Sequence, residues 1–346
     1  MFESKQIPYY IFGAGIVFMI GSLTNRAKSS LDTNNDDEMI KNYLLNESPL
    51  YGYNRPKIWI HSKYELNARK WKDFYSRNTT NLNQDYIHLT IKTIINHCGN
   101  DFNICLIDDD SFSKLLPNWD IDLVNIAEPH KSNYRTMGLV QLVHLYGGMV
   151  VPNSFLCLKN LKTFYDEHTE KNQAFVCETI NRTSNIVKGT NSGHFISGLE
   201  IFGANKSNNT MFGLIEFMKE MNRNGHFHEE NKFLGSLQHE CNEKNKDGHL
   251  TIVGGDYIGI KTTNRKPILI DDLFEESYID LPTYAYGIHI PADDVLKRKN
   301  FQWFASMHPK EIMKTNIIIS KYLKASITDT SNEYYKQTQH RSVVSI

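Results

Sequence analysis

The sequence has little cysteine and little proline, and neither sign of charge predominates. Its five cysteines are spread over 346 residues without a C-x-x-C pair, and prolines number 10. Structural zinc sites usually bring cysteines in close pairs, so zinc is not expected, while a disulfide stays open. The net charge is −1 at pH 7. Because no basic field exists to recruit a nucleic acid, we expect no nucleic-acid partner.

Long apolar runs are scarce too, and the one at 7–23 carries no charge. As a helix it would cover about 25 Å, slightly under a hydrocarbon core of about 30 Å. We predict a single-pass N-terminal membrane anchor at 1–24, with a cleaved signal peptide or a buried helix as alternatives. The flanking positive charges nearly balance, so the orientation stays open.

Two further segments, 25–54 and 325–346, are polar and include the acidic run at 32–38. Such a composition cannot bury enough apolar surface to fold alone. We predict a flexible stem and a polar tail on either side of one domain at 55–324.

Within that domain, short apolar runs alternate with helical periods. Strands are predicted at 57–61, 103–107, 149–151, 155–158, 175–177, 199–202, 252–260 and 267–270. Helices are predicted at 87–98, 112–116, 137–146, 211–221 and 232–241. Strands that alternate with helices imply parallel crossovers, so we predict an α/β fold with a mixed, mainly parallel sheet flanked by helices.

Three of these strands carry the central prediction. At least three strands within 55–161 are expected to be parallel and joined by helices, with Ile58, Ile60, Ile104, Leu106 and Val150 buried. The cysteines at 105 and 157 lie in strand-like runs and are predicted to be buried as small apolar side chains.

The segment 134–161, YRTMGLVQLVHLYGGMVVPNSFLCLKNL, resembles the core of the capsular-polysaccharide-synthesis and DxD-sugar-binding glycosyltransferases. In that group a helix beginning Ser-Asp-x-x-Arg leads through Leu-Tyr-x-Tyr-Gly-Gly into a strand ending in Asp-x-Asp. RPKIWIH and FNICLIDDDSFSKLLP resemble the family's first and second strands. The chain is also similar to glycosyltransferase-like proteins of large DNA viruses, for which a host endomembrane or the virion would be the location.

The resemblance implies an A-type glycosyltransferase (Rossmann-like) fold that moves a sugar from a nucleoside diphosphate. It also implies Mn²⁺ or Mg²⁺, held by the two aspartates, to neutralise the diphosphate leaving group. Gly147 and Gly148, which match the family's glycine pair, become candidate substrate-binding residues.

This chain departs from the family at the residues that would hold the metal. Counted from the glycine pair, the two aspartates fall on Pro152 and Ser154, and the helix aspartate and arginine fall on Thr136 and Leu139. Asn153 can offer one carbonyl oxygen, whereas hard cations prefer several anionic oxygens. We therefore predict no metal site, with Pro152, Asn153 and Ser154 kept only as substrate-contact candidates.

A rival metal or nucleotide site is Asp108-Asp109-Asp110, which follows a strand. Asp108 and Asp110 are therefore candidates too, although Asp110 or Ser111 can instead cap the next helix. Weaker candidates are a His-rich run at 226–230, His308 near the domain end, and the pair at 271–272, which is predicted to be an acidic turn after a strand.

Two functions remain open from sequence. One is a membrane-anchored glycosyltransferase-fold protein without a working metal motif, kept as a scaffold, assembly component or carbohydrate binder. The other is an active transferase, either metal-independent or using Asp108 and Asp110. Expected partners are a membrane, a nucleotide sugar or glycan, and other assembly proteins.

Overall fold

The computed structural model describes residues 55–62, 84–181, 194–223 and 230–328, all within the compact unit 47–346. The predicted anchor at 1–24 and stem at 25–54 lie outside the described residues. None of the helices formed by the described residues is both long and apolar enough to cross a bilayer.

In the part of the chain that the structure describes, eight strands form two sheets. They are β1 (Lys57–His61), β2 (Asn103–Ile107), β3 (Gly148–Val150), β4 (Phe155–Cys157), β5 (Ala174–Ile180), β6 (Phe195–Ala204), β7 (Leu250–Val253) and β8 (Gly287–His289). The larger sheet has the order β2-β1-β3-β6-β5-β7, and β4 pairs with β8 in the smaller one. In the larger sheet, β1 pairs in parallel with β2 and β3, and β5 with β7, whereas β6 is antiparallel to both its neighbours.

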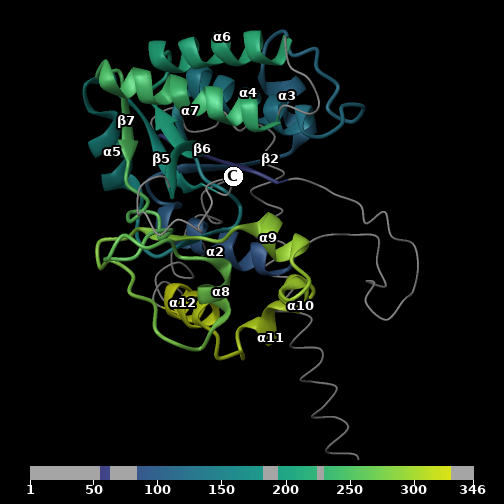
Figure 1. The fold of residues 1–346 in the computed structure, drawn as a ribbon, viewed down its shortest axis with the longest axis vertical. Helices are drawn as coiled ribbons and strands as arrows, with labels where there is room; N and C mark the ends of the chain where they lie inside the picture. The colour runs from purple at the N-terminus through teal and green to yellow at the C-terminus, as the bar shows by residue number, and fades with distance from the viewer. Residues whose placement is uncertain (1–54, 63–83, 182–193, 224–229, 329–346) are drawn as a thin grey trace, which may run out of the picture. The chain divides into compact units, whose positions relative to one another are not determined.

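Helices pack on both faces of the larger sheet. They are α2 (Tyr86–Cys98), α3 (Asp109–Leu115), α4 (His130–Tyr146), α5 (Lys162–Thr169), η1 (Glu170–Asn172), α6 (Asn209–Arg223), α7 (Glu230–Lys246), α8 (Ile270–Phe274), α9 (Ala292–Lys297), α10 (Gln302–Ala305), α11 (Pro309–Ile312) and α12 (Ile318–Thr328). In Figure 1, α3, α4, α6 and α7 lie above the sheet and α2 and α8 to α12 lie below it. This confirms the predicted α/β class.

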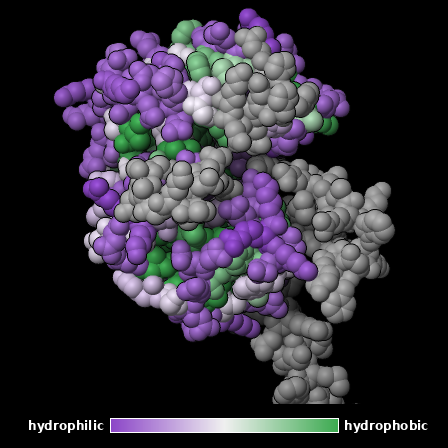
Figure 2. All heavy atoms as spheres, in the orientation of Figure 1, coloured by the Kyte–Doolittle hydropathy of each residue, from purple (hydrophilic) through white to green (hydrophobic). Residues whose placement is uncertain are grey.

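Each helical layer has its own apolar core. One core joins alternate strand residues, such as Trp59, Cys105 and Val150, to α4, α6 and α7. The other joins α2, α8 and α12 to β4 and β8. On the face drawn in Figure 2, hydrophobic residues show as separate small patches among hydrophilic ones. The burial predicted for Ile58, Ile60, Ile104, Leu106 and Val150 is confirmed.

Several predicted boundaries were wrong. The run 252–260 is a strand only to Val253, because Gly254 and Gly255 turn the chain. The run 267–270 is not a strand of either sheet, and its last residue begins α8. The helix predicted at 137–146 begins earlier, at His130. The helix α12 continues past the predicted domain end at 324, and Ser326 within it is buried, its Oγ donating to the carbonyl of Cys157 over 2.6 Å.

All five cysteines are buried free thiols, including the two predicted to be so. Cys98 and Cys157 lie closest, with their sulfurs 3.9 Å apart. Burial raises the pKa of the Cys105 thiol to about 12. Protonated buried thiols behave as small apolar side chains, which fits their places in the core.

The step from α4 to β3 depends on two glycines. Gly147 ends α4 with φ 72° and Gly148 begins β3 with φ 101°. A Cβ on Gly148 would lie 2.2 Å from the carbonyl oxygen of Lys57 on β1. Only glycine combines this backbone conformation with such a close approach.

We expect Gly148→Ala to lower the unfolding free energy by about 2 kcal/mol or more, because positive φ and a backbone clash add together. Gly235→Ala is the matched control, since Gly235 lies in α7 and a Cβ there meets nothing within 4 Å. That change should be neutral or stabilise by up to about 1 kcal/mol. Urea unfolding followed by circular dichroism measures both, and equal effects would contradict the backbone argument.

Candidate functional site

The sequence-predicted candidates at 108–110 and 152–154 lie at one edge of the larger sheet, whereas Gly147 and Gly148 lie at the opposite end of β3. The parallel strands β1, β2 and β3 end there at His61, Ile107 and Val150. In open α/β sheets, ligands bind outside the carboxyl ends of such strands. Since β2 and β3 flank β1, the segments 108–110 and 152–154 leave the same edge about 10 Å apart.

Asp108 is the N-cap of α3. Its Oδ1 accepts hydrogen bonds from the Ser111 amide at 2.9 Å and the Ser111 hydroxyl at 2.6 Å. The Asp108 amide donates back to Ser111 Oγ over 3.1 Å. The predicted cap at Asp110 or Ser111 was therefore wrong by position, because the reciprocal bonds require the cap three residues before Ser111. Asp110 is exposed within the first turn.

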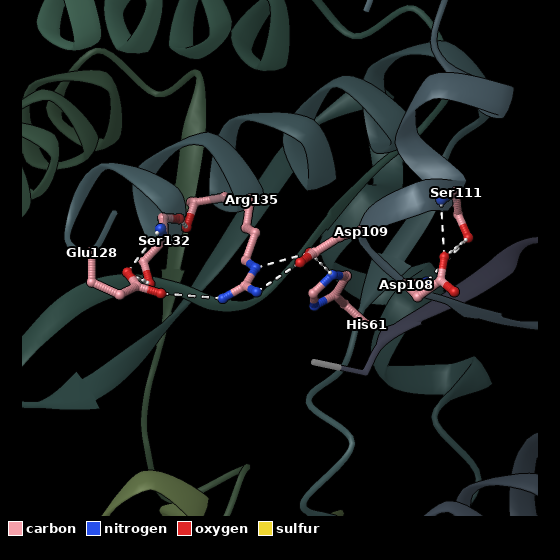
Figure 3. A network of polar contacts seen from close by, with 8 residues as sticks. His61, Asp108, Asp109, Ser111, Glu128, Ser132 and Arg135 are labelled. Carbon is pink, nitrogen blue, oxygen red and sulfur yellow. Dashed lines mark hydrogen bonds and ion pairs between the residues drawn. The ribbon is translucent and has the colours of Figure 1, made fainter. Parts of the chain in front are cut away.

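The middle aspartate, Asp109, points into a polar network instead (Figure 3). Arg135 of α4 donates from Nε to Asp109 Oδ1 over 2.8 Å and from Nη2 to Oδ2 over 2.7 Å. His61 Nε2 lies 2.9 Å from the same Oδ1. Arg135 Nη1 also reaches Glu128 Oε1 at 3.3 Å. Such two-pronged arginine–carboxylate contacts are strong and fix geometry.

Burial and charge act in opposite directions on Asp109. Burial raises the pKa of its carboxyl, but hydrogen bonds and positive charge from His61 and Arg135 more than offset this. The pKa therefore lies well below its usual range, and Asp109 is ionised at neutral pH. Arg135 is 6% exposed, so its charge is balanced by Asp109 and Glu128 rather than by solvent.

At the end of β3, the polar groups of residues 152–154 are used inside the fold. The buried Ser154 hydroxyl donates to the carbonyl of Ile290 over 2.7 Å. The carbonyl of Asn153 accepts from Thr90 Oγ1 over 2.5 Å. Pro152 is half-buried and carries no side-chain donor or acceptor. This segment offers no carboxylate, so its donor set does not fit Mn²⁺ or Mg²⁺.

Groups of metal ligands could also lie among the other described residues. Among those residues, no three or more His, Cys, Asp or Glu side chains are grouped as metal ligands would be. The run 226–229 lies outside the described residues. His308 is exposed and caps α11, where its Nδ1 accepts from the Lys310 amide over 3.3 Å.

The acidic pair 271–272 was predicted as a turn after a strand, and this was wrong. Both residues lie in the first turn of α8, where Asp272 Oδ2 accepts from the Leu269 amide over 2.8 Å. Asp271 pairs with Arg298 over 2.6 Å and 2.7 Å. Short acidic residues favour a helix N-terminus, which explains the helix there.

Positions 136 and 139 of α4 bring no functional group to the edge. The hydroxyl of Thr136 donates to the Ser132 carbonyl over 3.0 Å, and Leu139 packs against the core. The arginine of α4 that contacts the edge is Arg135, a position that counting back from the glycine pair did not single out. Both Arg135 and Asn133 are buried on α4, and this burial could not be read from the sequence.

A second polar group was missed completely. His289 on β8 lies opposite Phe155, the residue after Ser154, and its Nδ1 is 3.3 Å from Glu200 Oε2. Thr179 Oγ1 donates to the same Glu200 oxygen over 3.1 Å. The three residues come from β5, β6 and β8, so no spacing in the sequence links them. They place an imidazole and a carboxylate beside the end of β3.

Neither a protein-family model nor a curated protein matches the sequence. Among solved structures, the chain is similar to the glycosyltransferase GlyE of Streptococcus pneumoniae, at 11% identity and a TM-score of 0.36 over 79% of this chain and 64% of that one. It is also similar to the galactosyltransferase LgtC in complex with donor and acceptor sugar analogues. The identity is 12% and the TM-score 0.33, over 74% of this chain and 98% of that one. A third similar structure is the PaToxG glycosyltransferase, at 11% identity and a TM-score of 0.32 over 60% of this chain and 78% of that one. The fold class itself rests on the sheet order and helices described above.

The Asp109 network makes a pH-dependent prediction. Because the folded-state pKa of Asp109 is depressed, its stabilisation is complete above the unfolded-state value of about 4 and is lost as pH falls below it. Asp109→Asn should therefore cost about 1.5–3 kcal/mol of unfolding free energy at neutral pH. The difference from the native protein should shrink as pH falls from about 4 toward 2.

The control is Asp110→Asn, which removes an exposed carboxylate from the same helix turn and should cost less than about 1 kcal/mol. Urea unfolding across this pH range measures all three proteins. A difference for Asp109→Asn that stays constant with pH would show that the ion pair is not the source of the stabilisation.

Proposed function

We propose that this chain is a glycosyltransferase-fold protein that binds a nucleotide sugar or glycan without a divalent cation, and that it serves as a binding or assembly component. The observation that carries this proposal is the end of β3. There, Pro152 and Ser154 stand at the two aspartate positions of the family. Ser154 is buried, and its hydroxyl donates a hydrogen bond to the carbonyl of Ile290.

The chemistry explains why this segment matters. Transfer from a nucleoside diphosphate leaves a diphosphate, and the metal is the usual means of stabilising its charge. Removing one such electrostatic group typically costs a factor of about 10²–10³ in rate. Positions 152 and 154 lack both carboxylates, so metal-assisted transfer has no support at this segment.

A protein cation can in principle replace a metal, and among the described residues Arg135 is a cation at this edge. Its guanidinium is already engaged by Asp109 and Glu128. To bind a diphosphate it would have to leave a partly buried carboxylate, and breaking a buried pair is costly. This favours binding over metal-independent transfer.

The test is thermal stability in the presence of sugar nucleotides. A ligand at 100 times its dissociation constant stabilises a fold by about 2.7 kcal/mol, which is a shift of several degrees in Tm for a domain of this size. We expect any shift produced by a panel of UDP-sugars to be the same with Mn²⁺ as with EDTA.

A Tm rise that requires Mn²⁺, or release of UDP from a UDP-sugar by the native protein, would overturn the proposal. In that case Asp108→Asn and Asp110→Asn would be the first variants to examine. Pro152→Asp combined with Ser154→Asp is the complementary variant. It is expected to gain Mn²⁺ dependence of binding without gaining turnover, because Thr136 and Leu139 still lack the family's polar groups.

We further propose that the apolar segment 7–23 tethers the domain to a membrane. The support is its uncharged length and its polar flanks. The full chain should remain in the membrane fraction after alkaline carbonate extraction. A chain beginning at Tyr51 should be found in the soluble fraction. Release of the full chain by carbonate would contradict the tether.

A further inference from the structure

A group of tyrosines outside the sheet edge has no part in the site described above. We call Tyr257, Tyr284 and Tyr286 the tyrosine platform. The rings of Tyr257 and Tyr284 have centroids 5.3 Å apart, and those of Tyr257 and Tyr286 are nearly parallel, 19° apart in plane, at 6.5 Å. The platform therefore joins the turn after β7 to the segment that leads into β8.

The platform is held from below by a buried ring. Phe164 of α5 is 1% exposed and lies 5.3 Å from Tyr286 and 6.2 Å from Tyr257. The backbone adds a direct link, because the Tyr286 amide donates to the Tyr257 carbonyl over 2.8 Å. Aromatic contacts of this kind contribute beyond simple burial, so the rings are fixed in place before any ligand arrives.

The outermost ring, that of Tyr284, is exposed to solvent and is held in its orientation by a hydrogen bond. Tyr284 is 50% exposed, and its hydroxyl donates to Asp256 Oδ2 over 2.6 Å. This hydrogen bond from the tyrosine to the carboxylate raises the pKa of Tyr284, so the phenol stays protonated. An ionised carboxylate has about four acceptor positions, so Asp256 can accept from a ligand as well as from Tyr284.

We propose that the tyrosine platform and Asp256 bind a pyranose unit of a glycan, with the C–H face of the sugar stacked on Tyr284 and a sugar hydroxyl donating to Asp256. The proposal rests on the proposed function in taking the ligand to be a sugar. It deepens that function by giving the glycan a place that involves neither the nucleotide nor the end of β3.

The chemistry of the surface favours a sugar over a protein partner. A stable protein interface buries about 800 Å² on each side, with a desolvated apolar centre. Here Tyr257 and Tyr286 are half-buried, and the one open ring is bonded to a carboxylate. A rigid aromatic face beside a hydrogen-bond acceptor suits a small ligand with both C–H and O–H groups.

The experiment is saturation-transfer NMR on the full chain with methyl β-D-glucoside, methyl β-D-galactoside, methyl α-D-mannoside and methyl N-acetyl-β-D-glucosaminide. Each is offered at about ten times a dissociation constant of order 1 mM. We expect transfer to at least one glycoside, strongest at the ring protons of one sugar face. Tyr284→Ala should weaken binding about tenfold, in line with the loss of an aromatic contact.

Two further variants separate the roles. Tyr284→Phe keeps the ring and removes the hydroxyl, so it should retain most of the binding. Tyr278→Ala removes a tyrosine that is 83% exposed and outside the platform, and it should bind like the native protein. Native-like circular dichroism of each variant establishes that folding is unchanged.

The outcomes distinguish the two proposals. If no glycoside shows transfer, or if Tyr284→Ala binds as tightly as the native protein, the platform proposal is wrong. The metal-independent Tm shift with UDP-sugars, measured on the same variants, reports on the proposed function separately. Self-association that Tyr284→Ala abolishes, without glycoside binding, would identify the platform as a protein interface and would also overturn the proposal.

Discussion

The close approach of β3 to β1 at Gly148 is the constraint on which the remaining structure depends. A single methyl group there would lie 2.2 Å from the Lys57 carbonyl oxygen. With glycine, β3 pairs with both β1 and β6, and the sheet continues from its parallel half into the half that contains the antiparallel strand β6. That continuity brings the end of β3, the Asp109 network and the β8 histidine to one edge. The close packing and the positive φ angles account for glycine at both positions.

At that edge, the buried and half-buried polar groups of the Asp109 network and of Ser154 are bonded to one another or to the backbone. Asp109 is matched by Arg135 and His61, Arg135 also by Glu128, and Ser154 by the carbonyl of Ile290. Catalytic sites usually keep an interaction available for the transition state, either an open coordination position on a metal or a charge that is not already paired. A network with its charges already paired stabilises the fold instead. This arrangement supports the proposal that the edge has been retained for binding rather than for metal-assisted transfer.

The sequence predicted those parts of the fold that depend on local patterns. Apolar runs identify β1 and β2, a helical stripe identifies α2, and a glycine at positive φ ends α4, because each signal lies within one element. The start of α8 was missed, since a short apolar run does not distinguish a strand from a helix and Asp272 decides between them. The site was harder to predict. His61, Asp109 and Arg135 are separated by 48 and 26 positions, so only the folded sheet brings them together.

The surroundings of Asp109 and of Asp256 differ in one physical respect. Asp109 lies under Arg135, which is 6% exposed, so its carboxylate is turned inward against a permanently charged partner. Asp256 is half-buried beside a tyrosine that is 50% exposed, and the partner is a neutral hydroxyl. A neutral partner leaves the negative charge of Asp256 uncompensated by that bond, and the open ring leaves a face for stacking. By this criterion, the surface best able to accept a new ligand lies beside Tyr284, whereas the carboxylate of Asp109 is engaged within the fold.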